Sequence, residues 1–243
     1  MEHKLVKIGR EKFIKEKDNT IPFLPNTEMN ELINDLDNTP HAFVLACLMD
    51  RQVKAERAWS IPYYIKNELG TFDIHELANI SLEEYIRIFE EKKLHRFNET
   101  MAKCFFDAIH RILNVYDGDV SKIWKDKPSS AKVVYEFLQF NGAGIKIATM
   151  IANILARDFK IPYSDYYSID ISPDIHITRI MKRNGLVSIN ADIDSIIYKA
   201  REMCPEYPGI IDEACWEIGR TWCHPSNPNC NKCILTDVCK KVV

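Results

Sequence analysis

The chain has 243 residues, 46% of them hydrophobic, which suits one large domain or two small ones with a sizeable core. Its charged start lacks the apolar region of a signal peptide and no apolar run could span a bilayer, so we expect an intracellular protein. The net charge of −3 does not indicate a nucleic-acid-binding protein, although local charge can differ.

The first half of the chain is predicted to be helical. Apolar residues recur at helical spacing over residues 43–49, 80–88 and 105–113. Ser81-Leu-Glu-Glu84 has the pattern of a capping box before the second of these segments. We find no alternating strand pattern and no internal repeat, so the pattern favours an all-α protein.

A glycine-containing turn is predicted next, between a helix that ends near Gln139 and a new helix with an apolar face over residues 147–155. Gly142 and Gly144 permit a tight turn with positive φ and a close approach of another molecule to the backbone. The free N–H groups at the start of the second helix would suit a phosphate. The same pattern also fits an ordinary helix–helix turn.

Lys146 falls in the first turn of that second helix. The positive end of the helix dipole favours the neutral amine, which is the nucleophilic form able to make a Schiff base. The alternative is a surface lysine that merely touches phosphate.

An irregular, tyrosine-rich segment is predicted over residues 158–173, and a helix start follows at Asp174. His176, Arg179 and Arg183 recur at helical spacing in this helix. Asp174 places an acidic side chain at this helix start, where the ordinary role is a helix N-cap. Asp170 is a second acid in the same part of the chain.

The tail contains four of the eight cysteines, Cys223, Cys230, Cys233 and Cys239, in the pattern Cys-x6-Cys-x2-Cys-x5-Cys. In a reducing compartment such a cluster indicates metal ligands rather than disulfides. Residues 220–243 carry four Lys or Arg and one Asp, a local charge of 4 − 1 = +3, and Lys232 could meet a phosphate backbone. The remaining four cysteines, Cys47, Cys104, Cys204 and Cys215, are expected to be buried thiols.

Three of these segments together resemble the helix-hairpin-helix DNA glycosylases of the endonuclease III branch. Gly142-Ala-Gly-Ile-Lys146 is similar to the family's hairpin with its catalytic lysine. Asp174-Ile-His-Ile-Thr-Arg179 is similar to the segment with its catalytic aspartate, and residues 219–239 resemble its iron–sulfur loop. A weaker match, Cys47–Val53, would make Gln52 the residue inserted into the duplex at the damaged site.

The resemblance implies an all-α, two-lobed helix-hairpin-helix glycosylase fold with a C-terminal [4Fe–4S] cluster loop. We expect a helical bundle over residues 38–165 and a second helical domain from residues 1–37 plus 166–243, with the cluster held by Cys223, Cys230, Cys233 and Cys239 in residues 223–239. A zinc site of four cysteines is the alternative, but zinc more often uses two Cys-x2-Cys pairs.

The implied function is base-excision repair by a DNA glycosylase with AP lyase activity, acting as a monomer on double-stranded DNA with a damaged base, an oxidised pyrimidine being favoured, or an abasic site. Such an enzyme would be found in the cytoplasm or nucleoid of a prokaryote, or in a nucleus. Lys146 would attack C1′ and Asp174 would stabilise positive charge on the sugar, across a groove between the lobes. Contacts to DNA would come from Gln52, Gly142, Gly144, His176, Arg179 and Lys232.

Some residues depart from the family pattern. Asn141, Phe140 and Ile175 stand where the family usually has proline, leucine and threonine, and 27 residues separate Lys146 from Asp174, more than expected. The alternatives are therefore a monofunctional mismatch or damaged-base glycosylase, a non-catalytic DNA-damage binding protein on the same scaffold, and a zinc-binding module.

Overall fold

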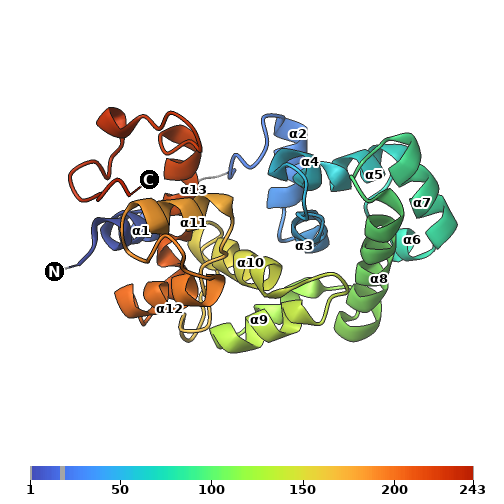
Figure 1. Ribbon diagram of the computed structural model, residues 1–243. Coiled ribbons are helices and arrows are strands. Elements are labelled where there is room, and N and C mark those ends of the chain that lie inside the picture. Colours follow the sequence, from blue (N-terminus) through green and yellow to red (C-terminus); the bar gives the residue numbers. More distant parts are fainter. Residues whose placement is uncertain (1, 17–19, 243) are drawn as a thin grey trace. The chain divides into compact units, whose positions relative to one another are not determined.

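The structure is a computed structural model that describes residues 2–16 and 20–242 (Figure 1). This part of the chain consists of helices and connecting segments and contains no strand. The α-helices are α1 (Lys4–Ile14), α2 (Thr27–Asn34), α3 (Pro40–Leu48), α4 (Ala55–Trp59), α5 (Ile61–Leu69), α6 (Ile74–Ala78), α7 (Leu82–Glu91), α8 (Asn98–Tyr116), α9 (Ser130–Leu138), α10 (Ile145–Arg157), α11 (Ile175–Arg183), α12 (Ile193–Met203) and α13 (Asp212–Thr221). Short 3-10 helices are η1 (Val120–Ile123), η2 (Pro208–Ile211) and η3 (Cys230–Lys232).

The chain divides into two compact units. Unit 1 comprises Met1–Lys17, Ser129–Val134 and Ala148–Val243, and unit 2 comprises Asp18–Pro128 and Tyr135–Ile147. The division differs from the predicted domains in three segments: residues 18–37 belong to unit 2, and residues 129–134 and 148–165 belong to unit 1. Helices α9 and α10 each contribute residues to both units, so a boundary drawn between helices could not have matched this division.

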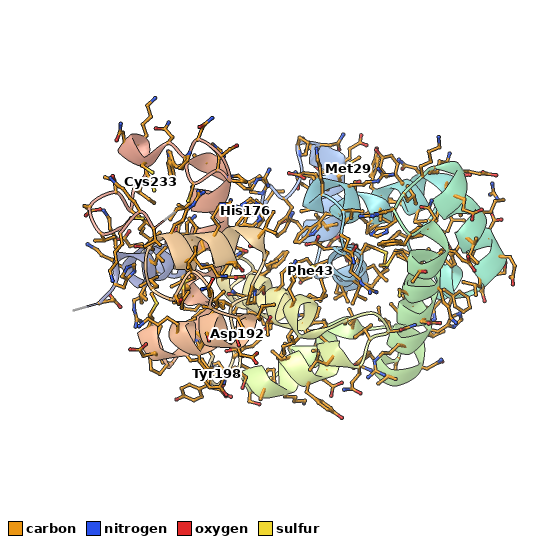
Figure 2. The ribbon with its side chains drawn as sticks, in the orientation of Figure 1. Met29, Phe43, His176, Asp192, Tyr198 and Cys233 are labelled. Atoms are coloured by element: carbon orange, nitrogen blue, oxygen red, sulfur yellow. The ribbon has the colours of Figure 1, made fainter. Side chains whose placement is uncertain are left out.

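Unit 2 is built around α3, every residue of which is buried (Figure 2 labels its Phe43). Pro40 occupies the first turn, where its missing N–H costs no helical hydrogen bond. Helices α2, α4, α5 and α8 all pack against α3, and α7 packs along α8. The α7–α8 contact is aromatic: the ring centroid of Phe105 lies 5.5 Å from that of Tyr85 and 5.9 Å from that of Phe89.

The capping signal before α7 is confirmed in one of its two halves. The Ser81 hydroxyl accepts a hydrogen bond from the Glu84 backbone N–H at 3.2 Å. The Glu84 carboxylate binds Arg87 one turn later, which lowers the pKa of Glu84 below its usual value. In a capping box the Glu84 carboxylate would accept a hydrogen bond from the Ser81 backbone N–H; here it binds the guanidinium of Arg87 instead.

Unit 1 packs α11 against α13, and α1 against both α13 and η2. A buried polar link joins α10 to this assembly: Asn153 donates to the Gly209 carbonyl at 2.9 Å, and the Tyr207 hydroxyl donates to Asn153 at 2.5 Å. The link satisfies the amide of Asn153 in an interior where an unpaired amide would be costly. It fixes the position of α10 relative to η2 within this unit.

The tyrosine-rich segment is irregular, as predicted, and packs Tyr163 and Tyr166 against other residues of unit 1, while Tyr167 is 64% exposed. The Tyr163 hydroxyl donates to the Ala152 carbonyl at 3.2 Å in a buried site. Tyr166 stacks on Tyr207 at 5.0 Å and meets Phe13 of α1 edge-on at 5.5 Å. The extra length between Lys146 and Asp174 therefore adds apolar contact area to unit 1.

The membrane expectation can be compared with the helices directly. Within residues 2–16 and 20–242, no helix combines the length and apolar character needed to cross a bilayer.

Candidate functional site

The predicted turn between two helices is confirmed. Helix α9 ends at Leu138, residues 139–144 form the turn, and α10 begins at Ile145. Gly142 has φ of +84°, a left-handed conformation that side chains rarely adopt. Gly144 has no positive φ, and a Cβ added there would meet nothing within 4 Å. Its lack of a side chain therefore leaves an open approach to the backbone at the start of α10.

The turn is anchored to α8 by the side chains of the two residues that precede Gly142. Phe140 is 2% exposed and stacks on Tyr116 at 6.2 Å, under the guanidinium of Arg111. Asn141 donates to the Asp107 carboxylate at 2.6 Å. The two departures from the family pattern, Phe140 and Asn141, thus provide the contacts that hold the turn in this protein.

Lys146 is exposed in the first turn of α10, two residues after Gly144. The preceding Ile145 is also exposed, with 53% of its surface accessible. The position matches the prediction: an amine beside the open backbone of a helix start. Both residues belong to unit 2.

Gln52 lies in the connection between α3 and α4, also in unit 2. Its side chain is exposed and its φ is +56°. A left-handed backbone at a residue other than glycine costs of order 1 kcal/mol and is found preferentially at functional sites. The structure thus shows Gln52 as an exposed residue with a left-handed backbone in this connection.

Asp174 is the N-cap of α11, so its alternative role is present in the structure. Its Oδ1 accepts from the backbone N–H groups of His176 at 2.7 Å and Ile177 at 2.8 Å. These two bonds fix the carboxylate at the positive end of the helix while leaving the residue half-buried. The arrangement positions a carboxylate rigidly, which a group that stabilises a developing positive charge requires.

His176 and Arg179 contact each other and the neighbouring helix α13. Arg179 donates to His176 Nδ1 at 2.9 Å, to the Gly219 carbonyl at 3.0 Å and to the Cys223 carbonyl at 2.6 Å. A Cβ at Gly219 would lie 2.7 Å from the Cβ of His176. These contacts give both side chains a structural role in joining α11 to α13; their contact with DNA stays a prediction.

Asp170, the second acidic candidate, is engaged elsewhere. Its carboxylate receives two hydrogen bonds from the guanidinium of Arg201, at 2.8 and 2.7 Å. The Asp170 side chain is 10% exposed, and this two-pronged contact with Arg201 balances its charge in a nearly buried position. The carboxylate of Asp174, in contrast, accepts hydrogen bonds from backbone N–H groups of its own helix.

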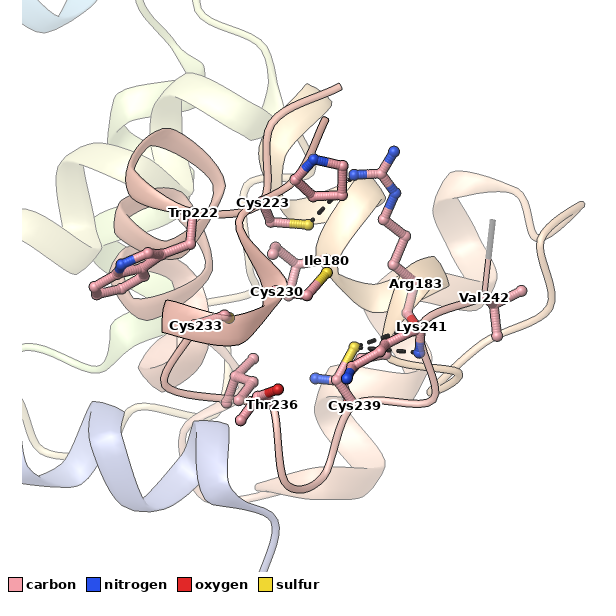
Figure 3. Close-up of a pocket in the computed structure, with 13 residues that line it drawn as sticks. Ile180, Arg183, Trp222, Cys223, Cys230, Cys233, Thr236, Cys239, Lys241 and Val242 are labelled. Carbon is pink, nitrogen blue, oxygen red and sulfur yellow. Dashed lines mark hydrogen bonds between the residues drawn. The ribbon is translucent and has the colours of Figure 1, made fainter. Parts of the chain in front are cut away.

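The four tail cysteines line one small cavity of about 50 Å³ (Figure 3). Burial raises the pKa of the Cys233 thiol, and the nearby thiols of Cys223, Cys239 and Cys230 raise it further. In the described part of the chain, no group of three or more His, Cys, Asp or Glu is arranged around a single point as a metal ion requires. The structure thus gathers the thiols around one space but does not show a closed zinc site, in which all four sulfurs would lie about 2.3 Å from one ion.

Hydrogen-bond donors surround the sulfurs of this loop. The Lys241 backbone N–H donates to Cys239 Sγ at 3.4 Å, and Arg183 lies 3.6 Å from Cys223 Sγ. Arg183 also donates to the carbonyls of His224 at 2.6 Å and Pro225 at 2.7 Å. Donors of this kind stabilise thiolate ligands of iron–sulfur clusters. Lys232 is exposed on η3, in the same loop.

The four other cysteines, Cys47, Cys104, Cys204 and Cys215, are buried free thiols, as predicted. Burial raises the pKa of Cys47 and Cys215 well above the usual value. A thiol with a raised pKa is a poor nucleophile, so these residues act as apolar side chains in the core.

Sequence comparison and structure comparison give different results. No protein-family model matches the sequence, and no curated protein is significantly similar to it. A trapped covalent intermediate of endonuclease III with DNA superposes with a TM-score of 0.62 at 16% identity, covering 88% of this chain and 95% of that one. A thermostable thymine-DNA glycosylase gives 0.60 at 14% identity, covering 87% and 93%. The 8-oxoguanine glycosylase/lyase of Clostridium acetobutylicum in complex with double-stranded DNA gives 0.55 at 16% identity, covering 74% and 59%.

At these identities the likeness establishes the fold. The chain has an all-α fold like that of endonuclease III and of the thymine-DNA glycosylase.

Proposed function

We propose that this chain is a base-excision DNA glycosylase with AP lyase activity, acting through Lys146 and Asp174. The observation that carries the proposal is the hairpin: a left-handed Gly142, an open approach at Gly144 and an exposed Lys146 in the next helical turn. An open backbone at a helix start suits a phosphate, and a lysine beside it can reach the sugar attached to that phosphate. The glycosylase fold supports the same assignment.

The reaction would begin with the damaged nucleotide rotated out of the duplex, because a base inside the stack cannot be reached. The neutral amine of Lys146 forms a bond to C1′ as the bond from C1′ to the base breaks, and the base leaves with its bonding electrons and takes up a proton. The carboxylate of Asp174 stabilises the positive charge that develops on the sugar. The ring then opens to a Schiff base between Lys146 and C1′.

Strand cleavage would follow from the Schiff base. Loss of a proton from C2′ allows β-elimination, which breaks the bond between C3′ and its phosphate on the 3′ side of the lesion. Hydrolysis of the Schiff base then returns Lys146. We propose oxidised pyrimidines as the substrate class, on the resemblance of the hairpin and aspartate segments to endonuclease III.

Gln52 would fill the space vacated by the rotated nucleotide, since a wedged side chain offsets the lost stacking. Its exposed position and left-handed backbone support this role. We propose that His176, Arg179 and Lys232 contribute to the DNA surface of unit 1. His176 and Arg179 would do so while holding α11 and α13 together.

Cys223, Cys230, Cys233 and Cys239 would hold a [4Fe–4S] cluster. The shared cavity and the donors at Cys239 and Cys223 fit thiolate ligands of such a cluster. When bound, the cluster supplies the covalent cross-links that order residues 223–239. Lys232 would be presented to the phosphate backbone by the ordered loop.

Borohydride trapping tests the catalytic part of the proposal. The protein is incubated with duplexes that carry an oxidised pyrimidine, uracil, 8-oxoguanine or an abasic site, and covalent complexes are separated on a denaturing gel. We expect a complex on the oxidised pyrimidine and on the abasic site, and none with Lys146→Ala. Asp174→Asn is expected to retain trapping on the abasic site but to lose it on the base lesion.

The controls separate the competing functions. Lys132→Ala, an exposed lysine on α9, should leave trapping unchanged. Base release without trapping would indicate a monofunctional glycosylase. Damage-specific binding with neither base release nor trapping would indicate a non-catalytic binding protein, and both outcomes would overturn the Schiff-base mechanism.

A further inference from the structure

Arg51 precedes Gln52 in the loop between α3 and α4, and the structure brings it to the hairpin. A Cβ built on Gly142 would lie 2.9 Å from Arg51 Nη1 and 2.9 Å from Cys104 Sγ. The guanidinium therefore borders the left-handed glycine of the hairpin. Burial raises the pKa of the Cys104 thiol, and the positive charge of Arg51 opposes that rise. All three residues belong to unit 2, so this contact lies within one compact body.

Among the described residues, no carboxylate neutralises the charge of Arg51. Arg51 is exposed, and it forms no ion pair with any residue in the described ranges 2–16 and 20–242. Arg87, another exposed arginine of unit 2, binds both Glu84 and Glu91. An arginine held against a thiol, next to a glycine turn, keeps its N–H donors available for an anion.

We propose that Arg51 donates to the same DNA phosphate that the hairpin backbone holds. The inference rests on the proposed function, because it takes DNA as the ligand. A guanidinium matches two phosphate oxygens with two parallel N–H groups, and the hairpin amides supply further donors beside it. Because the next residue is Gln52, one loop would grip the phosphate with Arg51 and enter the duplex with Gln52.

This contact would matter because the chain as a whole is not basic. With a net charge of −3, its affinity for DNA depends on a few local cations. Each phosphate neutralised by a cation makes the logarithm of the binding constant fall more steeply with the logarithm of salt, by about 0.9. The salt dependence therefore reports whether Arg51 touches phosphate or only supports the turn.

The experiment measures binding of a fluorescent duplex with a tetrahydrofuran abasic analogue, which cannot form a Schiff base, by anisotropy between 50 and 200 mM salt. Arg51→Gln removes the charge at similar size, and Arg51→Lys retains the charge without the fork. Arg87→Ala is the control with the same change in net charge. Thermal unfolding of each variant monitors the fold.

We expect Arg51→Gln to bind more weakly and to have a salt slope smaller by about 0.9. The ratio of wild-type to variant affinity should then shrink about 3.5-fold between 50 and 200 mM salt. Arg51→Lys should keep the wild-type slope with reduced affinity, and Arg87→Ala should behave as wild type.

Two results would overturn the inference while the proposed function stands: a wild-type slope in Arg51→Gln, or weakened binding by Arg51→Gln and Arg51→Lys that follows a common loss of thermal stability. If Arg51→Gln does not fold, the test uses Arg51→Lys, which retains the positive charge. A smaller salt slope of DNA binding in folded Arg51→Lys would contradict the inference, because a lysine that neutralises the same phosphate should keep the wild-type slope. If the wild-type protein does not bind the duplex at all, the proposed function itself fails.

Discussion

The hairpin and the cysteine loop are both short connections with a proposed function, but they are stabilised differently. The hairpin carries its own support: buried Phe140, the Asn141–Asp107 hydrogen bond and a glycine whose conformation no other residue easily adopts. In the cysteine loop, residues 223–242, Leu235 is the one buried residue. Backbone carbonyls of this loop accept hydrogen bonds from Arg179 and Arg183, which belong to α11.

The difference indicates which part of the molecule depends on a ligand. A loop that buries little apolar surface gains little from the hydrophobic effect and needs cross-links to stay folded. The hairpin, in contrast, should keep its geometry whether or not DNA or a cluster is present. Breaking one region should therefore leave the other intact.

The largest expected effect is loss of the cluster on changing one ligand. Cys233→Ser should remove iron and acid-labile sulfide from the purified protein and make residues 223–239 sensitive to limited proteolysis. Cys204→Ser, at a buried thiol outside the tail, should keep its iron. Zinc in the wild-type protein, or unchanged iron in Cys233→Ser, would contradict the assignment of the ligands.

Arg179→Ala should weaken the support of the cysteine loop from outside. The change removes charged donors to the carbonyls of Cys223 and Gly219, and hydrogen bonds from charged groups contribute about 1.5–3 kcal/mol each. We expect unfolding in urea to show a loss of about 2–4 kcal/mol. Lys182→Ala on the same helix is the control, and an equal loss in both variants would show that α11 rather than the loop is affected.

The two hairpin glycines should respond differently to alanine. Gly142→Ala forces a side chain into a left-handed conformation and against Arg51 and Cys104, so we expect a loss of about 1–3 kcal/mol. Gly144→Ala meets open space and should change stability by less than about 0.5 kcal/mol.

Affinity for DNA gives a second comparison of Gly142→Ala and Gly144→Ala. Gly144→Ala, although stable, should bind the abasic-analogue duplex more weakly, because its methyl group occupies the approach to the backbone. Full binding by Gly144→Ala would mean that nothing comes close to that glycine. The urea and anisotropy measurements together distinguish a folding role from a contact role for each position.

The smallest expected effect on stability is at Gln52. Gln52→Gly relieves the left-handed backbone but gives the unfolded chain more freedom, so we expect a net gain between zero and about 1 kcal/mol. Trapping on a damaged base should nevertheless fall, because the wedge is lost. Gln52→Ala keeps the strain and should lose trapping to the same degree; normal trapping in both variants would exclude the wedge.

Local chemistry in the sequence determined most of the elements. Helical spacing of apolar residues, Ser81 before α7, and two glycines before α10 are short-range signals, and each is confirmed in the structure. The resemblance of three segments predicted the glycosylase fold, which the structural comparison confirms even though sequence comparison finds no relative. Spacing alone also placed the four tail cysteines in one loop.

Contacts between residues far apart in the chain were determined only by the tertiary structure. The contact of Arg51 with Gly142 and the fork of Arg201 on Asp170 join residues far apart in the chain, so no local pattern encodes them. Tyr166 packs in unit 1 against Phe13 of α1 and Tyr207, and Tyr163 donates a hydrogen bond to α10. The domain boundary also differs from the prediction, because α9 and α10 each contribute residues to both units. Periodicity indicates which face of a helix is apolar, but the partner of that face is chosen by the rest of the fold.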